Sequence, residues 1–180
     1  GTGRIGRTVL QHLSGFGCRL LAYDLYQNDE VKQIAEYVPL ETLLAECDVI
    51  TLHTNATEEN HHLIDAKAIA AMKPGAVIIN TARGKLIDSD ALIAGLESGK
   101  LGGAALDVLE NENGLYYYNR MGDVIPNPEL AALRSMPNVI LTDHTAFYTE
   151  EDVESMVQGV LESAQALVNG QPTRHDVTEK

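Results

Sequence analysis

Five short apolar runs, separated by segments with helical spacing, constrain the fold of this chain most strongly. Each run is apolar without interruption, which is typical of strands that are covered on both faces. The runs are RLLAYD (19–24), DVITLH (48–53), AVIINTA (76–82), GGAALDV (102–108) and NVILTDH (138–144), and helices are expected at about 4–16, 40–46, 65–73 and 88–98. This alternation predicts an α/β fold with a doubly wound parallel sheet.

Two segments depart from the alternation. The stretch ENENGLYYYNRMGDVIPNPEL (110–130) combines turn residues with three consecutive tyrosines and two prolines, which predicts a long loop that leads into a short helix. A further helix is expected to begin at Thr149, with three acidic residues in its first turn, and to end at Asn169-Gly170. Its long apolar stripe requires a partner.

Charge and composition narrow the class of partner. The chain has 13 Lys and Arg against 26 Asp and Glu, a net charge of −13, which argues against nucleic acid as a partner. No apolar run approaches the length of a membrane span, and no signal peptide is recognisable, so neither a membrane nor secretion is expected.

Cys18 and Cys47 are expected to be buried free thiols in a reducing cytosol, with a single disulfide as the alternative. No metal site is expected, because His61 and His62 adjoin in a polar loop without further ligands at useful spacing.

The first six residues carry a glycine pattern, GxGxxG, at Gly1, Gly3 and Gly6. Glycines at these positions let a backbone turn tightly and approach a pyrophosphate at the start of a helix. Asp24 ends the next apolar run, 18 residues past Gly6, where an acid would accept hydrogen bonds from a ribose and would favour NAD over NADP. The alternative is an ordinary tight turn beside a surface carboxylate. The strand that should precede the pattern is absent, so we expect a truncated nucleotide-binding domain.

Three polar groups follow the ends of predicted strands: Arg83, Glu112 and His144. In a parallel sheet these ends share one edge, where ligands bind. An arginine can hold a carboxylate with two hydrogen bonds, and a histidine beside a carboxylate can act as a general acid. Each group alone could instead be a surface ion pair, a solvated charge or a structural histidine. Together they would suit hydride transfer to a 2-keto acid.

The sequence resembles the D-isomer-specific 2-hydroxyacid dehydrogenases over nearly all of its length, and its D-lactate dehydrogenase branch in particular. The matching blocks are GTGRIG, YD, CDVITLH, MKPGAVIINTARGKLIDSDAL, GGAALDVLENE and MPNVILTDHTAFYT. The resemblance implies that Arg83 binds the substrate carboxylate and polarises the keto group. It implies that His144 exchanges a proton with the substrate oxygen, and that Glu112 pairs with His144 and favours its protonated form.

The resemblance also implies which residues hold NAD. They would cover the pyrophosphate, hold the ribose, line the cleft, and face the nicotinamide and its carboxamide. The expected set is Gly1, Gly3, Arg4, Ile5, Gly6, Asp24, Thr54, Asn55, Asn60, Thr81, Ala82 and Asp107. Two positions depart from the family pattern, since Asp143 and Asn55 stand where prolines are usual. Asp143 could either favour the protonated form of His144 or point to solvent.

The expected function is NAD-dependent interconversion of 2-keto acids and D-2-hydroxy acids, with pyruvate and D-lactate first. The alternatives are aryl-lactate, hydroxyisocaproate, glyoxylate or phosphoglycerate dehydrogenases, or a non-catalytic protein that senses NAD(H). Residues 1–148 would form the NAD-binding Rossmann domain, truncated before its first strand, and 149–180 a C-terminal helix and tail that return toward a missing substrate domain. By resemblance, the parent would be a cytoplasmic homodimer, and this segment alone would be inactive.

Overall fold

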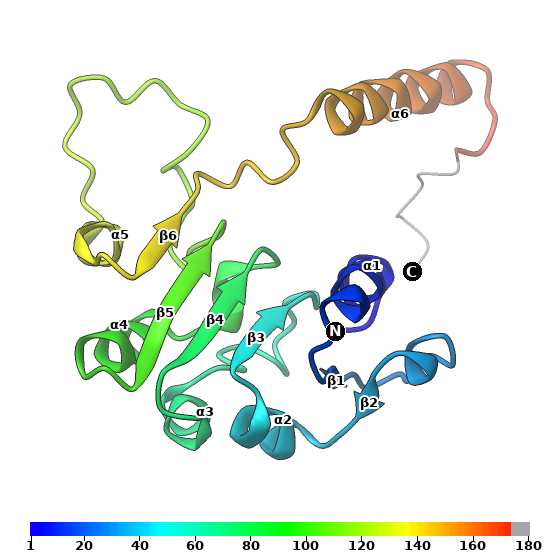
Figure 1. Cartoon of the computed structure of the whole chain (residues 1–180). Helices are drawn as coiled ribbons and strands as arrows, with labels where there is room; N and C mark the ends of the chain where they lie inside the picture. The colour runs from blue at the N-terminus through cyan, green and yellow to red at the C-terminus, as the bar shows by residue number, and fades with distance from the viewer. Residues whose placement is uncertain (174–180) are drawn as a thin grey trace. The chain divides into compact units, whose positions relative to one another are not determined.

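The computed structural model describes residues 1–173 of the chain (Figure 1). The chain forms two compact units, Gly1–His144 and Thr145–Lys180, which are considered separately.

All strand pairs in the first unit are parallel. A two-stranded sheet pairs β1 (Leu21–Ala22) with β2 (Glu36–Tyr37). A four-stranded sheet has the order β3-β4-β5-β6, with bounds Val49–Leu52, Ala76–Asn80, Leu101–Leu106 and Val139–Leu141 (Figure 1). The predicted parallel α/β architecture is confirmed. An apolar cleft lies between β1 and β3, lined by residues such as Leu10, Leu43 and Ile50.

Five helices belong to this unit: α1 (Arg4–Leu13), α2 (Leu40–Glu46), α3 (Ala66–Ala71), α4 (Ser89–Glu97) and α5 (Pro128–Ser135). Three begin at a side-chain cap, because Asp65, Asp88 and Asn127 each accept a hydrogen bond from a backbone N–H of the first turn. Three short 3-10 helices complete the unit: η1 (Ser14–Phe16), η2 (Val31–Gln33) and η3 (Gly84–Leu86). The predicted helix at 4–16 is therefore α1 continued by η1.

The core lies between the four-stranded sheet and the helices α2, α3, α4 and α5. Helices α2, α3, α4 and α5 pack in succession, and α4 and α5 also contact the strands β5 and β6. The most completely buried apolar side chains of this core are Ile64, Ile78, Leu86, Leu101 and Leu133, while Val31 belongs to a smaller cluster with Ala22 and Ala35. This core makes the sheet a rigid platform for the loops at its edge.

The second unit contains α6 (Glu150–Val168), as predicted from its cap and apolar stripe. Thr149 caps the helix by accepting a hydrogen bond from the Asp152 N–H, and three acidic residues occupy the first turn, where they complement the helix dipole. No helix within residues 1–173 combines the length and the apolar character needed to cross a membrane.

Both cysteines are free thiols, as predicted. The expectation that both are buried is wrong for Cys18, which is exposed because it follows the surface turn at Gly17 (φ 71°). Cys47 is half-buried, and burial followed by the charge of Asp48 raises the pKa of its thiol.

Candidate functional site

Three adjacent parallel strands end at one edge of the four-stranded sheet and deliver polar residues there. Arg83 follows the end of β4 by three residues, Asp107 follows β5 directly, and His144 follows β6 by three residues. Because β4, β5 and β6 are neighbours with the same direction, these residues emerge at the same edge. This is the edge that the strand pattern predicts for ligand binding.

Glu112 and His144 meet at this edge although 32 residues separate them. His144 Nδ1 lies 2.9 Å from Glu112 Oε1, and the second carboxylate oxygen, Oε2, accepts a 2.8 Å hydrogen bond from the Leu109 N–H. His144 adopts a left-handed backbone conformation (φ 52°), which is unusual for a residue with a side chain. The Tyr117 hydroxyl donates to the His144 carbonyl and helps to hold this conformation. The pair is therefore fixed from both sides.

Arg83 is exposed, and a buried asparagine shapes the turn that presents it. Asn80, only 1% exposed, donates from Nδ2 to the Arg83 carbonyl (2.9 Å) and accepts from the Ala82 N–H (3.0 Å). Arg83 Nη1 donates to the Ala82 carbonyl (2.6 Å). Within residues 1–173, Arg83 makes no hydrogen bond to Glu112 or His144.

Gly84 brings the Arg83 turn against the turn that carries Glu112. A Cβ atom at Gly84 would lie 2.0 Å from the Leu109 carbonyl oxygen and 2.5 Å from the Glu110 nitrogen. Only glycine permits this approach of one backbone to another. Sequence reasoning missed the roles of Asn80 and Gly84. The one available signal was a polar residue at the end of an otherwise apolar run.

The three glycines at the start of the chain have different roles. A Cβ at Gly6 would meet the Gly1 carbonyl oxygen at 2.1 Å, and a Cβ at Gly1 would meet the His53 carbonyl oxygen at 2.5 Å, so both positions need glycine for close packing. A Cβ at Gly3 would have no neighbour within 4 Å. Gly3 thus leaves open space at the first turn of α1, where a pyrophosphate can approach backbone N–H groups.

Asp24 is anchored beside this turn. Its Oδ2 accepts from the N–H (2.6 Å) and the hydroxyl (3.1 Å) of Thr2, and its Oδ1 accepts from the Tyr26 N–H (3.0 Å). Partial burial raises the pKa of Asp24, but the hydrogen bonds from Tyr26 and Thr2 outweigh it, and the net pKa is lowered. The lowered pKa favours the ionised carboxylate, and its three hydrogen bonds leave one of about four acceptor sites open. Thr2, which also accepts from the Tyr37 hydroxyl (2.7 Å), is a further site residue that sequence reasoning missed.

The loop after β3 lies against the glycine turn. Gly1 contacts the backbone at His53 and Thr54. Farther along the loop, Asn60 Nδ2 donates to the Asn55 carbonyl (2.7 Å), while Asn60 Oδ1 accepts from the Thr57 N–H (2.7 Å). The expected residues Thr54, Asn55 and Asn60 therefore form one ordered loop, which Gly1 joins to the start of α1.

The remaining expected cofactor residues lie at the start of α1 and after the strands β4 and β5. Arg4 and Ile5 are exposed in the first turn of α1. Thr81 is exposed and Ala82 is half-buried in the turn after β4. Asp107 is buried, and its Oδ1 accepts a 2.5 Å hydrogen bond from the Thr142 hydroxyl, which ties the end of β5 to the end of β6.

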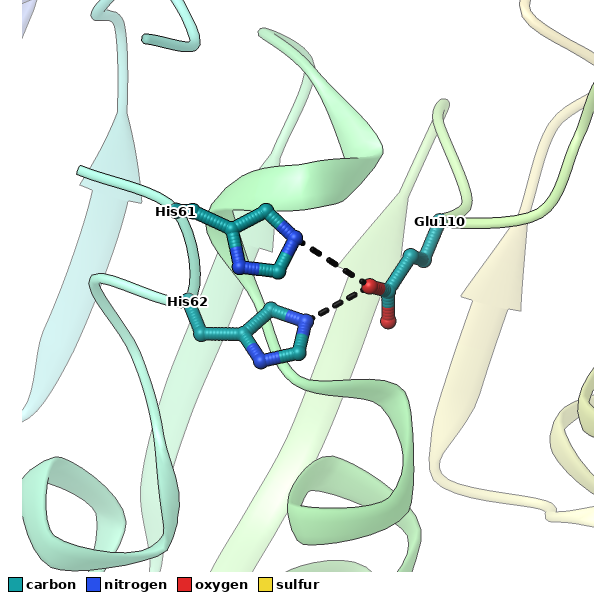
Figure 2. A group of neighbouring side chains, drawn as sticks. All are labelled: His61, His62 and Glu110. Carbon is teal, nitrogen blue, oxygen red and sulfur yellow. Dashed lines mark hydrogen bonds and ion pairs between the residues drawn. The ribbon is translucent and has the colours of Figure 1, made fainter. Parts of the chain in front are cut away.

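The structure tests two expectations from the sequence, one about the orientation of Asp143 and one about the neighbours of His61 and His62. Asp143 is exposed, and its Oδ1 pairs with Arg134 Nη2 at 3.0 Å on the surface. The expectation that His61 and His62 lack a further ligand is wrong, because the turn after β5 places Glu110 Oε1 at 2.6 Å from His62 Nε2 and 3.8 Å from His61 Nε2 (Figure 2).

The family model for the D-isomer specific 2-hydroxyacid dehydrogenase, NAD binding domain, matches residues 1–146. An aromatic 2-oxoacid reductase of Clostridium sporogenes is 48% identical over 166 residues, which are 92% of this chain and 50% of that protein. A D-lactate dehydrogenase of Lactiplantibacillus plantarum is 44% identical over 169 residues, which are 93% of this chain and 51% of that protein.

Solved structures agree with these relatives. The crystal structure of a D-lactate dehydrogenase from Treponema pallidum has a TM-score of 0.93 at 40% identity, and the match covers 99% of this chain and 54% of that one. A D-isomer specific 2-hydroxyacid dehydrogenase from Lactobacillus delbrueckii ssp. bulgaricus, in its NAD-complexed form, has a TM-score of 0.88 at 36% identity, over 97% of this chain and 53% of that one. The chain spans about half the length of these relatives. It belongs to the D-isomer specific 2-hydroxyacid dehydrogenase family, and residues 1–146 are the NAD-binding domain of that family.

Proposed function

We propose that the protein interconverts 2-keto acids and D-2-hydroxy acids with NAD, and that pyruvate and D-lactate are its first substrate pair. The observation that carries the proposal is the fixed Glu112–His144 pair at the carboxyl edge of β5 and β6. Family membership supports the choice of reaction, and the D-lactate dehydrogenases among the relatives support the choice of substrate.

The reaction needs a proton donor, and His144 is suited to that role. Reduction of a keto acid adds a hydride to C2 and a proton to the carbonyl oxygen, and bound NADH supplies the hydride. Glu112 accepts from Nδ1 of His144, so the ring presents Nε2 to the substrate oxygen. A carboxylate beside the imidazole stabilises the charged ring that donates the proton. In oxidation of the hydroxy acid, the neutral ring takes the same proton back.

The substrate carboxylate needs a cation, and we assign Arg83 to it. The guanidinium is exposed, and within residues 1–173 it forms no ion pair with a carboxylate. A two-pronged hydrogen bond to the substrate carboxylate would place the keto carbon between Arg83 and His144. Asn80 and Gly84 would act by positioning Arg83.

The residues near the amino terminus fit NAD. Gly3 offers open space at the start of α1, and Asp24 is an ionised, anchored acceptor for the ribose hydroxyls. A 2′-phosphate would meet this carboxylate, which favours NAD over NADP. Thr54, Asn55, Asn60, Asp107 and the Thr81–Ala82 turn would form the rest of the NAD-binding site.

Aromatic 2-keto acids are the second candidate substrate class. The specific observation in their favour is the 48% identity to a relative named aromatic 2-oxoacid reductase, against 44% to the D-lactate dehydrogenase of L. plantarum.

The test is NADH oxidation by the intact protein with pyruvate, phenylpyruvate, 2-ketoisocaproate and hydroxypyruvate, compared by kcat/KM. We expect turnover that is highest with pyruvate, and loss of most of it in Arg83→Ala through a higher KM. Arg134→Ala, which removes an exposed arginine from the nearby surface, is the matched control and should retain activity. Tight NADH binding without turnover of any keto acid would refute the enzyme and favour a sensor of NAD(H).

A further inference from the structure

We propose that His61, His62 and Glu110 form a binding site for a divalent transition-metal ion such as Zn²⁺. The site is separate from the residues assigned to hydride transfer, and the proposal does not depend on the proposed function. It rests on where three ligand-type side chains point, on the residues that hold them, and on the ion that this donor set prefers.

The three side chains converge on one point. The Nε2 atoms of His61 and His62 lie 3.8 Å and 2.6 Å from the same oxygen, Oε1 of Glu110 (Figure 2). All three ligand atoms lie within 4.8 Å of one another. The two rings are stacked, with centroids 3.9 Å apart and planes 28° from parallel. This stacking directs both Nε2 atoms toward the carboxylate.

The spacing is close to that of a bound metal. Four-coordinate zinc has bonds of about 2.0–2.2 Å, so neighbouring ligand atoms lie about 3.3 Å apart. The His62–Glu110 distance would have to open by about 0.7 Å and the His61–Glu110 distance to close by about 0.5 Å to reach that spacing. The ligand nitrogens of His61 and His62 lie within 4.8 Å of each other. Rotations of the three side chains would bring the donors to the spacing of a bound metal. Two imidazoles and a carboxylate are a donor set that zinc uses, with water in the fourth position.

Surrounding residues hold the donors in place. The His62 N–H donates to the Lys85 carbonyl (2.9 Å), which fixes the loop against η3. Asp88 accepts from the Ala91 N–H through Oδ1 (3.0 Å), and its Oδ2 lies 3.7 Å from Nδ1 of His62. A carboxylate behind the distal nitrogen of a histidine is the arrangement that orients metal-bound imidazoles in proteins. Asp88 is thus a positioning residue for His62.

A plain hydrogen-bonded pair would account for His62 and Glu110 but not for His61. The His61 side chain is 45% exposed, yet its ring stacks on His62 and turns Nε2 toward the oxygen that His62 already contacts. A metal ion would use all three groups at once. It would join the loop after β3 to the turn after β5, which are 48 residues apart in the chain.

The test is zinc titration of the intact protein, which carries no histidine tag and has been stripped of metal with a chelator. Calorimetry measures the binding. The absorption spectrum of bound Co²⁺ is a second readout that reports the coordination geometry. We expect one ion per chain at this site. His61→Ala should weaken zinc binding by at least about tenfold, and Glu110→Gln by at least as much, while Asp88→Asn should weaken it by about tenfold or more. His61 is exposed, so its variant separates loss of a ligand from loss of fold, and thermal melting checks the others.

Two controls define the site. His12→Ala removes an exposed histidine of α1, and His144→Ala removes the other histidine–glutamate pair, so both should bind zinc as the unmodified protein does. Failure to bind zinc with a stoichiometry of one would overturn the proposal. Zinc affinity in His61→Ala and Glu110→Gln equal to that of the unmodified protein would do the same, since the ion would then lie elsewhere.

Discussion

Two histidine–glutamate pairs, His62–Glu110 and His144–Glu112, share one turn of the chain and have almost the same local geometry. The nitrogen–oxygen distances are 2.6 Å and 2.9 Å, and both histidines have φ 52° with 30% of the side chain exposed. Their glutamates are two residues apart. Neither distance nor exposure therefore tells which pair could carry out chemistry on a substrate.

The difference lies in what surrounds each ring. His62 pairs through Nε2, its Nδ1 lies 3.7 Å from Asp88 Oδ2, and His61 stacks on one face, so both ring nitrogens face protein carboxylates. His144 pairs through Nδ1 and follows the end of β6 at the carboxyl edge of the sheet. A histidine–carboxylate pair becomes an acid–base group only when its second nitrogen can reach a substrate.

Replacing each histidine should separate the two pairs by the largest margin. His144→Ala should lower kcat for 2-keto acid reduction by about 10²- to 10⁴-fold, because it removes the proton donor. His62→Ala should cost less than about tenfold, since both nitrogens of its ring already face protein carboxylates. Steady-state NADH oxidation measures both. Equal losses in the two variants would mean that both pairs serve the fold and that neither is the acid.

The glutamates offer a sharper version of the same test. Glu112→Gln should lower kcat/KM by about 10- to 100-fold, because the protonated His144 ring loses the negative charge that stabilises it. Glu110→Gln should leave kcat/KM close to that of the unmodified protein, because Glu110 contacts His61 and His62 and not His144. A larger loss in Glu110→Gln than in Glu112→Gln would reverse the assignment.

A common support for both pairs is Gly84, which packs on the backbone of Leu109 and Glu110. Gly84→Ala should destabilise the protein by about 1–3 kcal/mol, because a Cβ would have to displace that backbone. It should also lower both zinc binding and turnover. The matched control is Gly15→Ala, an exposed position where an added Cβ would meet no atom within 4 Å, which should stay within about 0.5 kcal/mol. Thermal melting decides, and an unshifted melt in Gly84→Ala would contradict the close approach.

Strand periodicity carried most of the fold prediction. The runs at 48–53 and 76–82 contain β3 and β4, because buried parallel strands are apolar throughout. The strand β2 was missed, because its two residues, Glu36 and Tyr37, are too few to show a period. Glu112 and His144 were named as candidates because each follows a strand end, and the resemblance implied their pairing, which the 2.9 Å contact confirms. Glu110 was not assigned to His61 and His62, because only the folded turn after β5 reveals that contact.

The smallest expected effect concerns Asp24, whose role can be separated from its structural bonds by pH. The pKa of Asp24 is lowered in the folded protein, so its ionised form stabilises the fold above the ordinary pKa of an unfolded aspartate, about 4. That contribution is lost as the pH falls through the lowered pKa. Because solvent screens this half-exposed carboxylate, Asp24→Asn should cost only about 1 kcal/mol at pH 7 and progressively less below about pH 4. It should also weaken NADH binding, because the ribose loses a charged acceptor. Chemical denaturation at pH 7 and below about pH 4 measures the stability cost. NADH titration measures the loss of cofactor affinity. A stability cost that is independent of pH would show that Asp24 acts through shape and not through its charge.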